Sequence, residues 1–368
     1  MVINIERRFG GAEKSIVDII EGVKAKSNYE ILFIVENIKM QKLLDAKGIK
    51  YKSIKLGEIQ FNIKGVIKVL YGNLKILKEV IFYKPDIIFS NTDLSHMLSI
   101  FISFIFKNRL VIILRDYGFR TFIKKILDFF SAKTIYVSKH LKQFYNDNSD
   151  NPVIPNGIKL ENINTSTISN KYRTKKEVLY CVATRFVEWK GIDILIEAFN
   201  LVNKELDQFN GKLLIAGEPK NNSKEYDYYI KLNELVKKHG LSSKVKFIGW
   251  VDNPINFFNN CDVILSSSTS NNGGPESFGR TIIEAWSVKK PVIATNCGGP
   301  SDLVKDNING LKVEENNIKE FKKALIDLYE NKDKRELLGY NGFQSVLGKY
   351  NIDNISDDYL KFINEIGG

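Results

Sequence analysis

The feature that most constrains the fold is an alternation, along the whole chain, of short apolar runs with longer amphipathic patterns. Short apolar runs are typical of strands buried on both faces, and the patterns between them have the period of helices. Strands that alternate with helices form a parallel sheet covered on both faces. The runs fall into two sets: Met1–Ile5, Ile31–Val35, Ile87–Ser90, Leu110–Leu114 and Thr134–Val137, and then Val178–Thr184, Lys212–Ile215, Val245–Ile248 and Asp262–Leu265.

The two sets predict two domains. A chain of 368 residues is longer than a single hydrophobic core usually organises. The segment Val153–Ile158 separates the sets, and its Pro and Asn-Gly indicate a rigid turn at a domain boundary. We therefore predict an α/β fold, with one doubly wound domain over residues 1–155 and a second over residues 156–349.

The positive charge is concentrated in the first of these domains. Residues 1–155 carry 25 Lys and Arg against 15 Asp and Glu, a net charge of +10, whereas the rest of the chain carries +1. This difference indicates an anionic partner for the first domain, either an acidic membrane face or nucleic acid. The opening residues lack the pattern of a signal peptide, so we expect a cytoplasmic protein. The most apolar segment, Met97–Phe106, is about half the ~20 residues that cross a bilayer, and it predicts a core helix.

The cysteines and histidines predict neither a disulfide nor a metal site. Cys181, Cys261 and Cys297 lie far apart in the sequence, and we interpret them as small buried apolar residues. The three histidines are scattered along the chain, which argues against a His-based metal cluster or a nucleophilic triad.

The stretch after the last apolar run contains the residues most suited to chemistry. We expect a helix to begin near Ser277, so that the backbone N–H groups of Ser277, Phe278 and Gly279 form a phosphate site at its positive end. Glu276 and Glu284 are eight residues apart and would lie about two turns apart on one helix face. Ionised carboxylates accept hydrogen bonds from neutral hydroxyls. Hydroxyl acceptors beside a phosphate site indicate a sugar nucleotide as the ligand.

This stretch resembles the signature of the retaining glycosyltransferases of family four, in which a Glu, seven residues and a second Glu follow a strand and a loop. The flanking residues match as well: Phe278-Gly279, Glu284-Ala285, Pro291–Thr295 and Gly298-Gly299. The resemblance is strong from Val178 to Leu328. It implies the GT-B fold, with two Rossmann-like domains facing across a cleft and a terminal helix, about residues 350–368, crossing back to the first domain.

The resemblance also implies an activity. The enzyme would move a hexosyl group from a nucleotide-diphosphate sugar to a glycan or lipid-linked acceptor, in cell-surface polysaccharide or glycolipid synthesis. Negative charge develops on the departing pyrophosphate, so cations are needed at its oxygens. At the matching positions, the resemblance assigns Arg185 and Lys190 to those phosphates, Glu276 to hydroxyls of the donor sugar and Glu284 to the ribose.

The resemblance assigns further positions to the donor. The Gly-Gly loop after the first strand would face the pyrophosphate, and the backbone after the strand Val245–Ile248 would face the nucleobase. The donor-binding positions are Gly10, Gly11, Val251, Ser277, Phe278, Gly279 and Glu284.

The chain departs from the family pattern in two places. Where the family commonly has a His with an acidic neighbour, this chain has Arg115-Asp116. We assign Asp116 to the site as an acceptor for a sugar hydroxyl, and the alternative is a strand-end salt bridge to Arg115. The loop Asn272–Pro275 places Gly-Gly-Pro before Glu276, which leaves the identity of the hexose open.

The expected mechanism uses neither a cofactor nor a metal, because two cations and helix-end N–H groups would replace a divalent ion. A double displacement needs a carboxylate nucleophile close to the anomeric carbon, and no residue is marked for that role. The family precedent is departure of the leaving group on the front face, with the donor phosphate taking the acceptor proton.

Three other classes of protein are alternatives. A sugar-nucleotide epimerase has the same architecture, and acceptor-dependent release of nucleoside diphosphate would distinguish a transferase from it. A Rossmann-type dehydrogenase needs Gly-x-Gly-x-x-Gly after the first strand, where only Gly10-Gly11 is present. A basic nucleic-acid-binding module would leave Glu276 and Glu284 unexplained, and the chain lacks a basic-aromatic RNA motif, so we expect no nucleic-acid partner.

Two helical patterns in the first domain predict peripheral attachment to the anionic inner face of the cytoplasmic membrane. In Phe61–Phe82, four lysines fall within roughly 80° of one another at ~100° per residue. In Phe119–Lys133, apolar and basic residues alternate as on an interfacial helix. The alternative for each is a helix packed on the sheet with a solvated basic face. The residues concerned are Lys64, Lys68, Lys75 and Lys78 in the first pattern, and Phe122, Ile126, Phe129, Phe130, Arg120, Lys124, Lys125 and Lys133 in the second.

Overall fold

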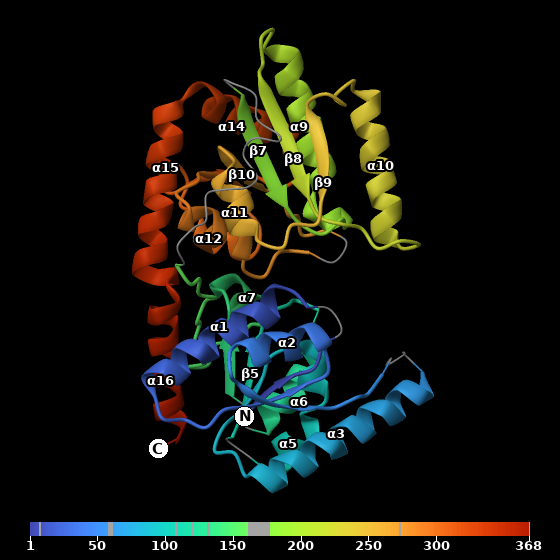
Figure 1. The fold of residues 1–368 in the computed structure, drawn as a ribbon, viewed down its shortest axis with the longest axis vertical. Coiled ribbons are helices and arrows are strands. Elements are labelled where there is room, and N and C mark those ends of the chain that lie inside the picture. Colours follow the sequence, from blue (N-terminus) through green and yellow to red (C-terminus); the bar gives the residue numbers. More distant parts are fainter. Residues whose placement is uncertain are drawn as a thin grey trace. The chain divides into compact units, whose positions relative to one another are not determined.

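The computed structural model describes residues 1–6, 9–57, 62–106, 109–118, 121–130, 133–160, 177–271 and 274–367, with the backbone alone at 121–123. The chain divides into two compact units (Figure 1). The N-terminal unit comprises Met1–Lys159 together with Asn351–Gly368, and the C-terminal unit comprises Leu160–Tyr350. Each unit is built around one six-stranded sheet whose strands all pair in parallel.

The sheet of the N-terminal unit has the strand order β3-β2-β1-β4-β5-β6. Its central strands are buried on both faces, which explains their continuous apolar sequences. The chain turns to the other side of β1 when it enters β4, so the carboxyl ends of β1 and β4 mark the topological switch point of this sheet. The strands are β1 (Val2–Asn4), β2 (Leu32–Val35), β3 (Lys50–Ser53), β4 (Ile88–Ser90), β5 (Leu110–Leu114) and β6 (Lys133–Tyr136).

The helices of the N-terminal unit include the last helix of the chain. Ile352 N donates to Ile158 O at 3.0 Å, which ties the start of this helix to the segment after β6. The helix then packs on the first helix at Gly22, where a Cβ atom would lie 2.0 Å from Ser356 Oγ. The helices are α1 (Gly11–Lys26), α2 (Ile38–Ala46), α3 (Ile63–Tyr83), α4 (Asp93–Met97), α5 (Ile100–Ile105), α6 (Thr121–Phe129), α7 (Lys139–Phe144) and α16 (Ile352–Gly367).

The sheet of the C-terminal unit has the strand order β12-β11-β10-β7-β8-β9. The chain runs from β7 outward to β9 and then returns to the other side of β7 as β10, so the switch point lies between β7 and β10. The strands are β7 (Val178–Ala183), β8 (Gly211–Ala216), β9 (Val245–Gly249), β10 (Val263–Ser266), β11 (Val292–Thr295) and β12 (Leu311–Val313).

Helices α9, α10 and α14 pack against this second sheet and form a hydrophobic core with it. Phe199 of α9 and Phe321 of α14 are wholly buried there, as the apolar period of both helices predicts. The helical elements are η1 (Glu188–Lys190), α9 (Ile192–Glu205), α10 (Lys224–Lys238), α11 (Pro254–Asn259), α12 (Arg280–Ser287), α13 (Gly299–Leu303), α14 (Ile318–Glu330), α15 (Lys332–Ser345) and η2 (Val346–Tyr350).

Every strand named in the sequence analysis is present. In the first unit, however, one strand was not predicted and one predicted helix is interrupted. The strand β3 was not predicted, because it is an edge strand of sequence KYKS with little apolar character. The predicted core helix Met97–Phe106 is interrupted: α4 ends at Met97, and Ser99 Oγ donates to Ser95 O at 2.7 Å before α5 begins. The end of α5 is exposed, with Phe104 at 46%.

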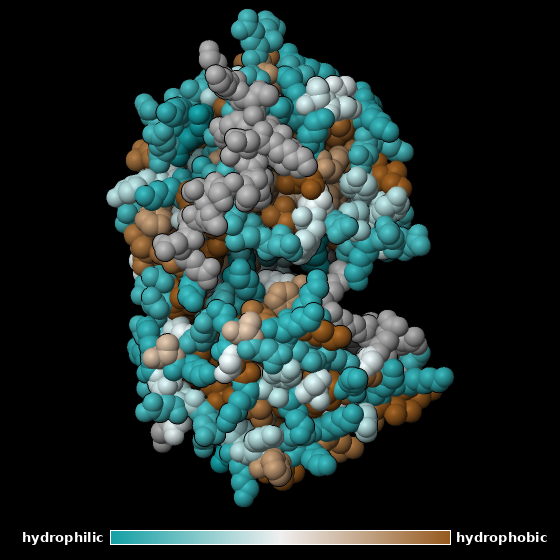
Figure 2. Space-filling view, in the orientation of Figure 1, coloured by the Kyte–Doolittle hydropathy of each residue, from teal (hydrophilic) through white to brown (hydrophobic). Residues whose placement is uncertain are grey.

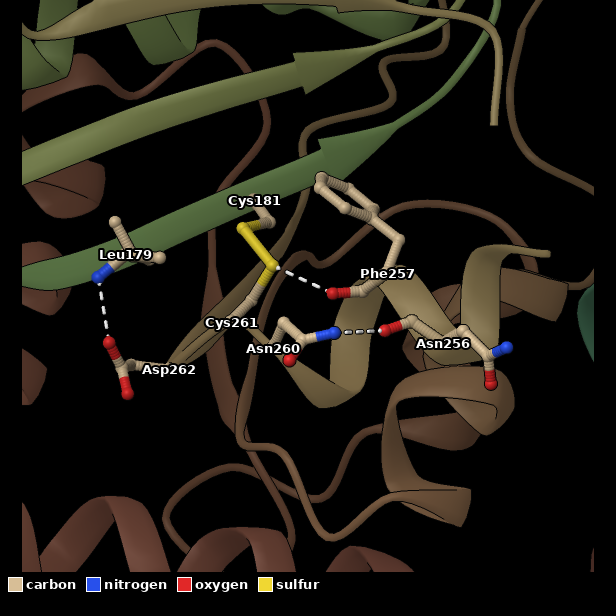
Figure 3. The surroundings of a disulfide bond; sticks show 7 residues. All are labelled: Leu179, Cys181, Asn256, Phe257, Asn260, Cys261 and Asp262. Atoms are coloured by element: carbon tan, nitrogen blue, oxygen red, sulfur yellow. Dashed lines mark hydrogen bonds between the residues drawn. A yellow bond between two sulfur atoms is a disulfide. The ribbon is translucent and has the colours of Figure 1, made fainter. Parts of the chain in front are cut away.

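The cysteine prediction is wrong, because Cys181 and Cys261 form a disulfide (Figure 3). Cys181 lies on β7 and Cys261 precedes β10, and Asp262 Oδ2 accepts from Leu179 N at 2.8 Å beside them. Parallel pairing of β7 with β10 brings the two Cα atoms to 6.2 Å, within the range that a disulfide spans. Their separation of 80 residues hides this proximity in the sequence. Cys297 is a free, buried thiol, as expected.

Candidate active site

A cavity of about 110 Å³ lies at the switch point of the C-terminal sheet. Loops at the carboxyl ends of parallel strands meet there, which is where doubly wound sheets bind ligands. Thr184 follows β7, Ser267 and Ser268 follow β10, and all three line the cavity. Of the residues predicted from the sequence, Lys190 and Glu276 line it directly.

Lys190 and Glu276 form an ion pair in this cavity. The Lys190 side chain is 13% exposed and the Glu276 side chain 23% exposed, so water screens the pair only partly. Lys190 Nζ also lies 4.2 Å from the centre of the Trp189 ring, and Arg185 Cζ lies 5.7 Å from it. One aromatic ring thus contacts both predicted phosphate-binding cations, of which Lys190 lines the cavity and Arg185 does not.

The loop that carries Lys190 is fixed to the loop after β10. Ser267 Oγ donates to Lys190 O at 2.7 Å, and Thr269 N donates to Trp189 O at 2.7 Å. Gly191 follows with φ +61°, and a Cβ atom there would lie 2.2 Å from Ser267 O. The Lys-Gly pair of the sequence therefore has a structural reason, since only glycine permits this close approach.

Glu276 is held in its charged form. Burial opposes ionisation, but the charge and hydrogen bond of Lys190, the charge of Arg185 and the backbone N–H of Gly279 together lower the pKa of Glu276 below its usual range. Gly299 N donates to Glu276 O at 2.7 Å and fixes the backbone of this loop. The Gly-Gly pair of the predicted motif, Gly298-Gly299, permits this contact, because a Cβ atom on Gly298 would lie 2.3 Å from Glu276 O.

The expected start of the helix near Ser277 is wrong. Helix α12 begins at Arg280, and Gly279 caps it with φ +95°. Ser277 and Phe278 are buried in the loop before the helix, so the positive helix end lies at Arg280 and Thr281, which both line the cavity. The turn at Gly279 moves the start of the helix to Arg280, and the sequence pattern did not indicate this shift.

The two glutamates do not share a helix face, because Glu276 lies outside the helix. Glu284 lies in the second turn of α12, where Arg280 Nε donates to its Oε1 at 2.9 Å. Its side chain is 7% exposed, and it does not line the described cavity. Val251 lies after the edge strand β9, at the same end of the sheet and also outside this cavity.

The Gly-Gly loop of the N-terminal unit begins helix α1. Gly10 caps the helix, Gly10 N donates to Glu13 Oε2 at 2.8 Å, and both glycines are exposed. Burial raises the pKa of Glu13, and the backbone hydrogen bond from Gly10 opposes that shift. The carboxyl group therefore sits directly behind the loop predicted to face pyrophosphate.

A buried polar cluster at the switch point of the N-terminal sheet was not predicted. Arg115, at the end of β5, donates through Nε to Asn91 Oδ1 at 2.7 Å and through Nη1 to Asn156 Oδ1. Ser15 Oγ of α1 donates to the same Asn156 oxygen at 2.7 Å, and Asn91 Nδ2 donates to Asn4 Oδ1 at 2.6 Å. Arg115 thus joins the ends of β1, β4 and β5 to the predicted boundary segment.

Asp116 is exposed at this end of the sheet, and Tyr145 OH donates to its backbone oxygen at 3.3 Å. Its neighbour in space is Asp93, at the start of α4. Burial, together with the negative charges of Asp116 and Glu6, raises the pKa of Asp93 to about 7. Asp93 was not identified from the sequence, because its significance depends on carboxylates contributed by other strand ends.

A metal ion would need several ligating side chains around one point. In the part of the chain that the structure describes, no group of three or more His, Cys, Asp or Glu side chains is placed to hold one.

Two parallel six-stranded sheets with these switch points define a protein of the GT-B class. Anabaena HepE in complex with UDP-glucose has a TM-score of 0.79 to this chain, with 20% identity and coverage of 99% of both chains. The lipopolysaccharide glycosyltransferase WaaG has a TM-score of 0.68, with 14% identity and coverage of 99% of both chains. The predicted fold class is therefore confirmed.

The model of the glycosyl transferases group 1 family matches residues 164–345. Through this segment the chain belongs to that glycosyltransferase family, which confirms the resemblance seen in the sequence.

Curated relatives agree with this family. An uncharacterized glycosyltransferase of Methanocaldococcus jannaschii is 33% identical over 58% of this chain and 54% of its own length. The lipopolysaccharide core biosynthesis glycosyltransferase LpsE of Rhizobium meliloti is 31% identical over 49% of this chain and 47% of its own length. The chain therefore spans about half the length of these two relatives. The capsular polysaccharide biosynthesis glycosyltransferase CapM of Staphylococcus aureus is 27% identical over 81% of this chain and 84% of its own.

The raised pKa of Asp93 predicts a pH-dependent stability. The pKa lies above the unfolded value, so between about pH 4 and 7 the folded chain holds a proton that the unfolded chain releases, and stability falls as pH rises. Asp93→Asn removes this charge. We expect the gain in melting temperature over the wild type to be larger at pH 8 than at pH 5. Asp207→Asn, at an exposed loop, controls for the substitution itself; equal gains for Asp93→Asn at both pH values would contradict the shift.

Proposed function

We propose that the protein is a retaining hexosyltransferase that uses a nucleotide-diphosphate sugar and transfers the hexosyl group to a glycan or lipid-linked acceptor, in cell-surface polysaccharide or glycolipid synthesis. The observation that carries the proposal is the Lys190–Glu276 pair in the cavity at the β7–β10 switch point. A cation for phosphate and a carboxylate for hydroxyls lie together where a Rossmann-like sheet binds its ligand.

The donor is a nucleoside diphosphate bound to a sugar, and the complex of the structural neighbour HepE with UDP-glucose supports a uridine nucleotide as the first to test. Arg185, Lys190 and the N–H groups at the start of α12 bind the pyrophosphate. Glu284 accepts from the ribose once it is released from Arg280, and the backbone at Val251 faces the nucleobase. Ser277, Phe278 and Gly279 complete the donor site of the C-terminal unit, and the family resemblance also assigns Gly10 and Gly11 to donor binding.

Donor binding changes the partner of Lys190. Without the donor, Glu276 neutralises Lys190, which limits the cost of keeping a cation in a partly buried cavity. A pyrophosphate supplies a second anion, so Lys190 can turn to it while Glu276 accepts from a hydroxyl of the sugar. The pair thus couples binding of the phosphate to recognition of the sugar.

The transfer step proceeds on one face of the sugar. The bond between the anomeric carbon and the phosphate oxygen breaks, and the acceptor oxygen forms its bond on the same face. The acceptor proton passes to the departing phosphate oxygen, which leaves a nucleoside diphosphate. Arg185 and Lys190 stabilise the charge that develops there, and Asp116 binds an acceptor hydroxyl.

The proposed location of the protein and of its acceptor rests on the net charge of the N-terminal unit. The +10 of residues 1–155 supports attachment of the N-terminal unit to an anionic membrane surface, on the inner face of the cytoplasmic membrane, where a lipid-linked acceptor is available.

The role of the cations predicts a specific kinetic effect. Because charge on the leaving group grows in the transition state, Lys190→Ala and Arg185→Ala should lower kcat by about 10²–10³, more than they raise the Kd for donor. Single-turnover transfer and calorimetric titration with donor separate the two quantities. Lys220→Ala, on an exposed loop of the same unit, is the control. A loss of donor affinity with unchanged kcat would contradict the role.

The different roles proposed for Glu276 and Glu284 predict different effects on binding of the free nucleotide. Glu276→Gln should abolish transfer while the variant still binds free nucleoside diphosphate, since this residue reads the sugar. Glu284→Gln should weaken binding of the free nucleotide by about tenfold, the order of one hydrogen bond to a charged group. Calorimetric titration with UDP, GDP and ADP measures nucleotide binding by both variants and shows which nucleobase is preferred. Equal losses in both variants would show that the assignment is wrong.

The metal-free mechanism predicts insensitivity to chelation. Two cations and the end of α12 supply the positive charge, so transfer should continue unchanged after dialysis against EDTA. Abolished transfer that a single divalent metal restores would contradict this mechanism.

A further inference from the structure

Helix α3 exposes the side chains that a packed helix would bury. Of the 23 large apolar side chains exposed in the described part of the chain, nine lie on this helix. Its buried face is narrow and contains only two large apolar residues, Ile76 and Val80. Beside them, Gly72 packs against Leu98, and Asn73 Nδ2 donates to Met97 O at 3.1 Å. The exposed residues are Ile63, Val66, Ile67, Leu70, Tyr71, Leu74, Ile81, Phe82 and Tyr83.

The exposed residues form a stripe and do not surround the helix. At ~100° per residue, the residues from Val66 to Leu74 in this set lie within roughly 140° of one another, opposite Gly72. Amphipathic helices normally direct such a stripe into the core. Here it points outward, and Figure 2 shows apolar side chains along the edge of the N-terminal unit where Figure 1 places α3.

Apolar side chains are also exposed at the ends of α5 and α6. Asn73 Oδ1 accepts from Phe101 N at 3.2 Å and joins α3 to the start of α5. The end of α5 exposes Ile105 at 57%, and the end of α6 exposes Phe129 at 81%. The rings of Phe104 and Phe130 lie 3.8 Å apart and connect these two helix ends. We call the exposed residues of α3, α5 and α6 the apolar face.

Lysines line one edge of the apolar stripe of α3, and Lys75 Nζ donates to Lys55 O at 3.5 Å. Lys64, Lys68, Lys75 and Lys78 follow this edge, and the single acidic residue of the helix, Glu79, is paired with Lys52 at 3.6 Å. Lys75 Nζ lies 4.5 Å from the centre of the Tyr71 ring, so its stem follows the apolar stripe.

The second pattern predicted for membrane contact contributes less. Lys124 of α6 is buried and paired with Asp128 at 2.6 Å, so it is not a surface cation, which corrects the prediction. Arg120 and the side chain of Phe122 lie outside the described residues, as does Phe61 at the start of the first pattern.

We infer that the apolar face of α3, α5 and α6 inserts shallowly into an anionic lipid bilayer, with the α3 lysines at the phosphate level. This inference deepens the membrane partner of the proposed function. Charge complementarity selects the occupant: an apolar stripe edged by cations matches acyl chains below anionic headgroups. Among the described residues no helix is long and apolar enough to cross a bilayer. A helix with an apolar stripe edged by cations lies along the surface of a bilayer. Attachment by lysines alone would leave the apolar stripe in water.

The test separates charge from insertion by sedimentation of the full chain with vesicles. Wild-type protein should bind vesicles of phosphatidylcholine with phosphatidylglycerol, and part of this binding should survive high salt. Changing the four lysines to Gln should lower affinity at low salt by about tenfold or more. Ile67→Gln with Leu70→Gln and Leu74→Gln should remove the salt-resistant part. These three residues are 59, 44 and 57% exposed, so the variant should fold.

Matched controls come from the other unit. Ile230→Gln, Leu337→Gln and Tyr340→Gln are 42, 58 and 51% exposed and should leave vesicle binding unchanged. Tyr71→Trp should show a blue-shifted emission on vesicles that brominated lipid quenches. The thermal shift with UDP should be the same in all variants, and its absence in wild type would count against the donor proposal alone.

Two outcomes would overturn the inference. The first is vesicle binding by the three-Gln variant of α3 that equals the wild type at every salt concentration. The second is a wild-type dimer by light scattering that becomes monomeric in this variant without any vesicle binding by the wild type, which would make the face an interface between two copies.

Discussion

Parallel strand pairing is the constraint on which both units depend. Two neighbouring parallel strands need a crossover between them, so every loop that leaves a carboxyl end meets the others at one edge of the sheet. Where the strand order reverses, two such loops separate and leave room for a ligand. In the C-terminal unit this point lies between β7 and β10, and the disulfide Cys181–Cys261 joins β7 to the segment just before β10. The same pairing therefore fixes the strands and opens the cavity between the loops that follow them.

The Lys190–Glu276 pair uses that opening. Keeping either charge alone in this partly buried cavity would cost free energy, and the opposite charge of its partner reduces that cost. Ser267 Oγ donates to Lys190 O, and Gly299 N donates to Glu276 O, so the backbone of both loops is fixed before any ligand arrives. Only glycine at positions 191 and 298 permits these close approaches. With the backbone fixed, only the side chains of Lys190 and Glu276 have to change partners when an anion binds, and charges held on such a fixed backbone are effective at stabilising a departing anion. Glycine at these positions thus allows the chain to turn and also places the loops that carry the two charges.

The sequence predicted every strand except β3 and singled out Lys190 and Glu276, because strands depend on local periodicity and these two residues on motif spacing. It failed where three-dimensional proximity decided the outcome. The left-handed turn at Gly279 delayed α12 by three residues, from Ser277 to Arg280, which removed Glu276 from the helix face it was expected to share with Glu284. The Arg115 cluster and the carboxyl group of Asp93 gather residues from separate strand ends, and their spacing in the sequence carries no sign of the contact. The disulfide was missed for the same reason.

Helix α3 shows a different limit of sequence reading. Its period identified an amphipathic helix correctly, but a period gives the angle between apolar and basic residues and not the direction in which either faces. The packing residues decide that direction: Gly72 and Asn73 fit closely against the chain between α4 and α5, and a large apolar residue at position 72 would collide with Leu98. Ile76 and Val80 are buried on the same face, and the apolar residues on the opposite side of the helix point outward. The exposed stripe therefore follows from how α3 packs.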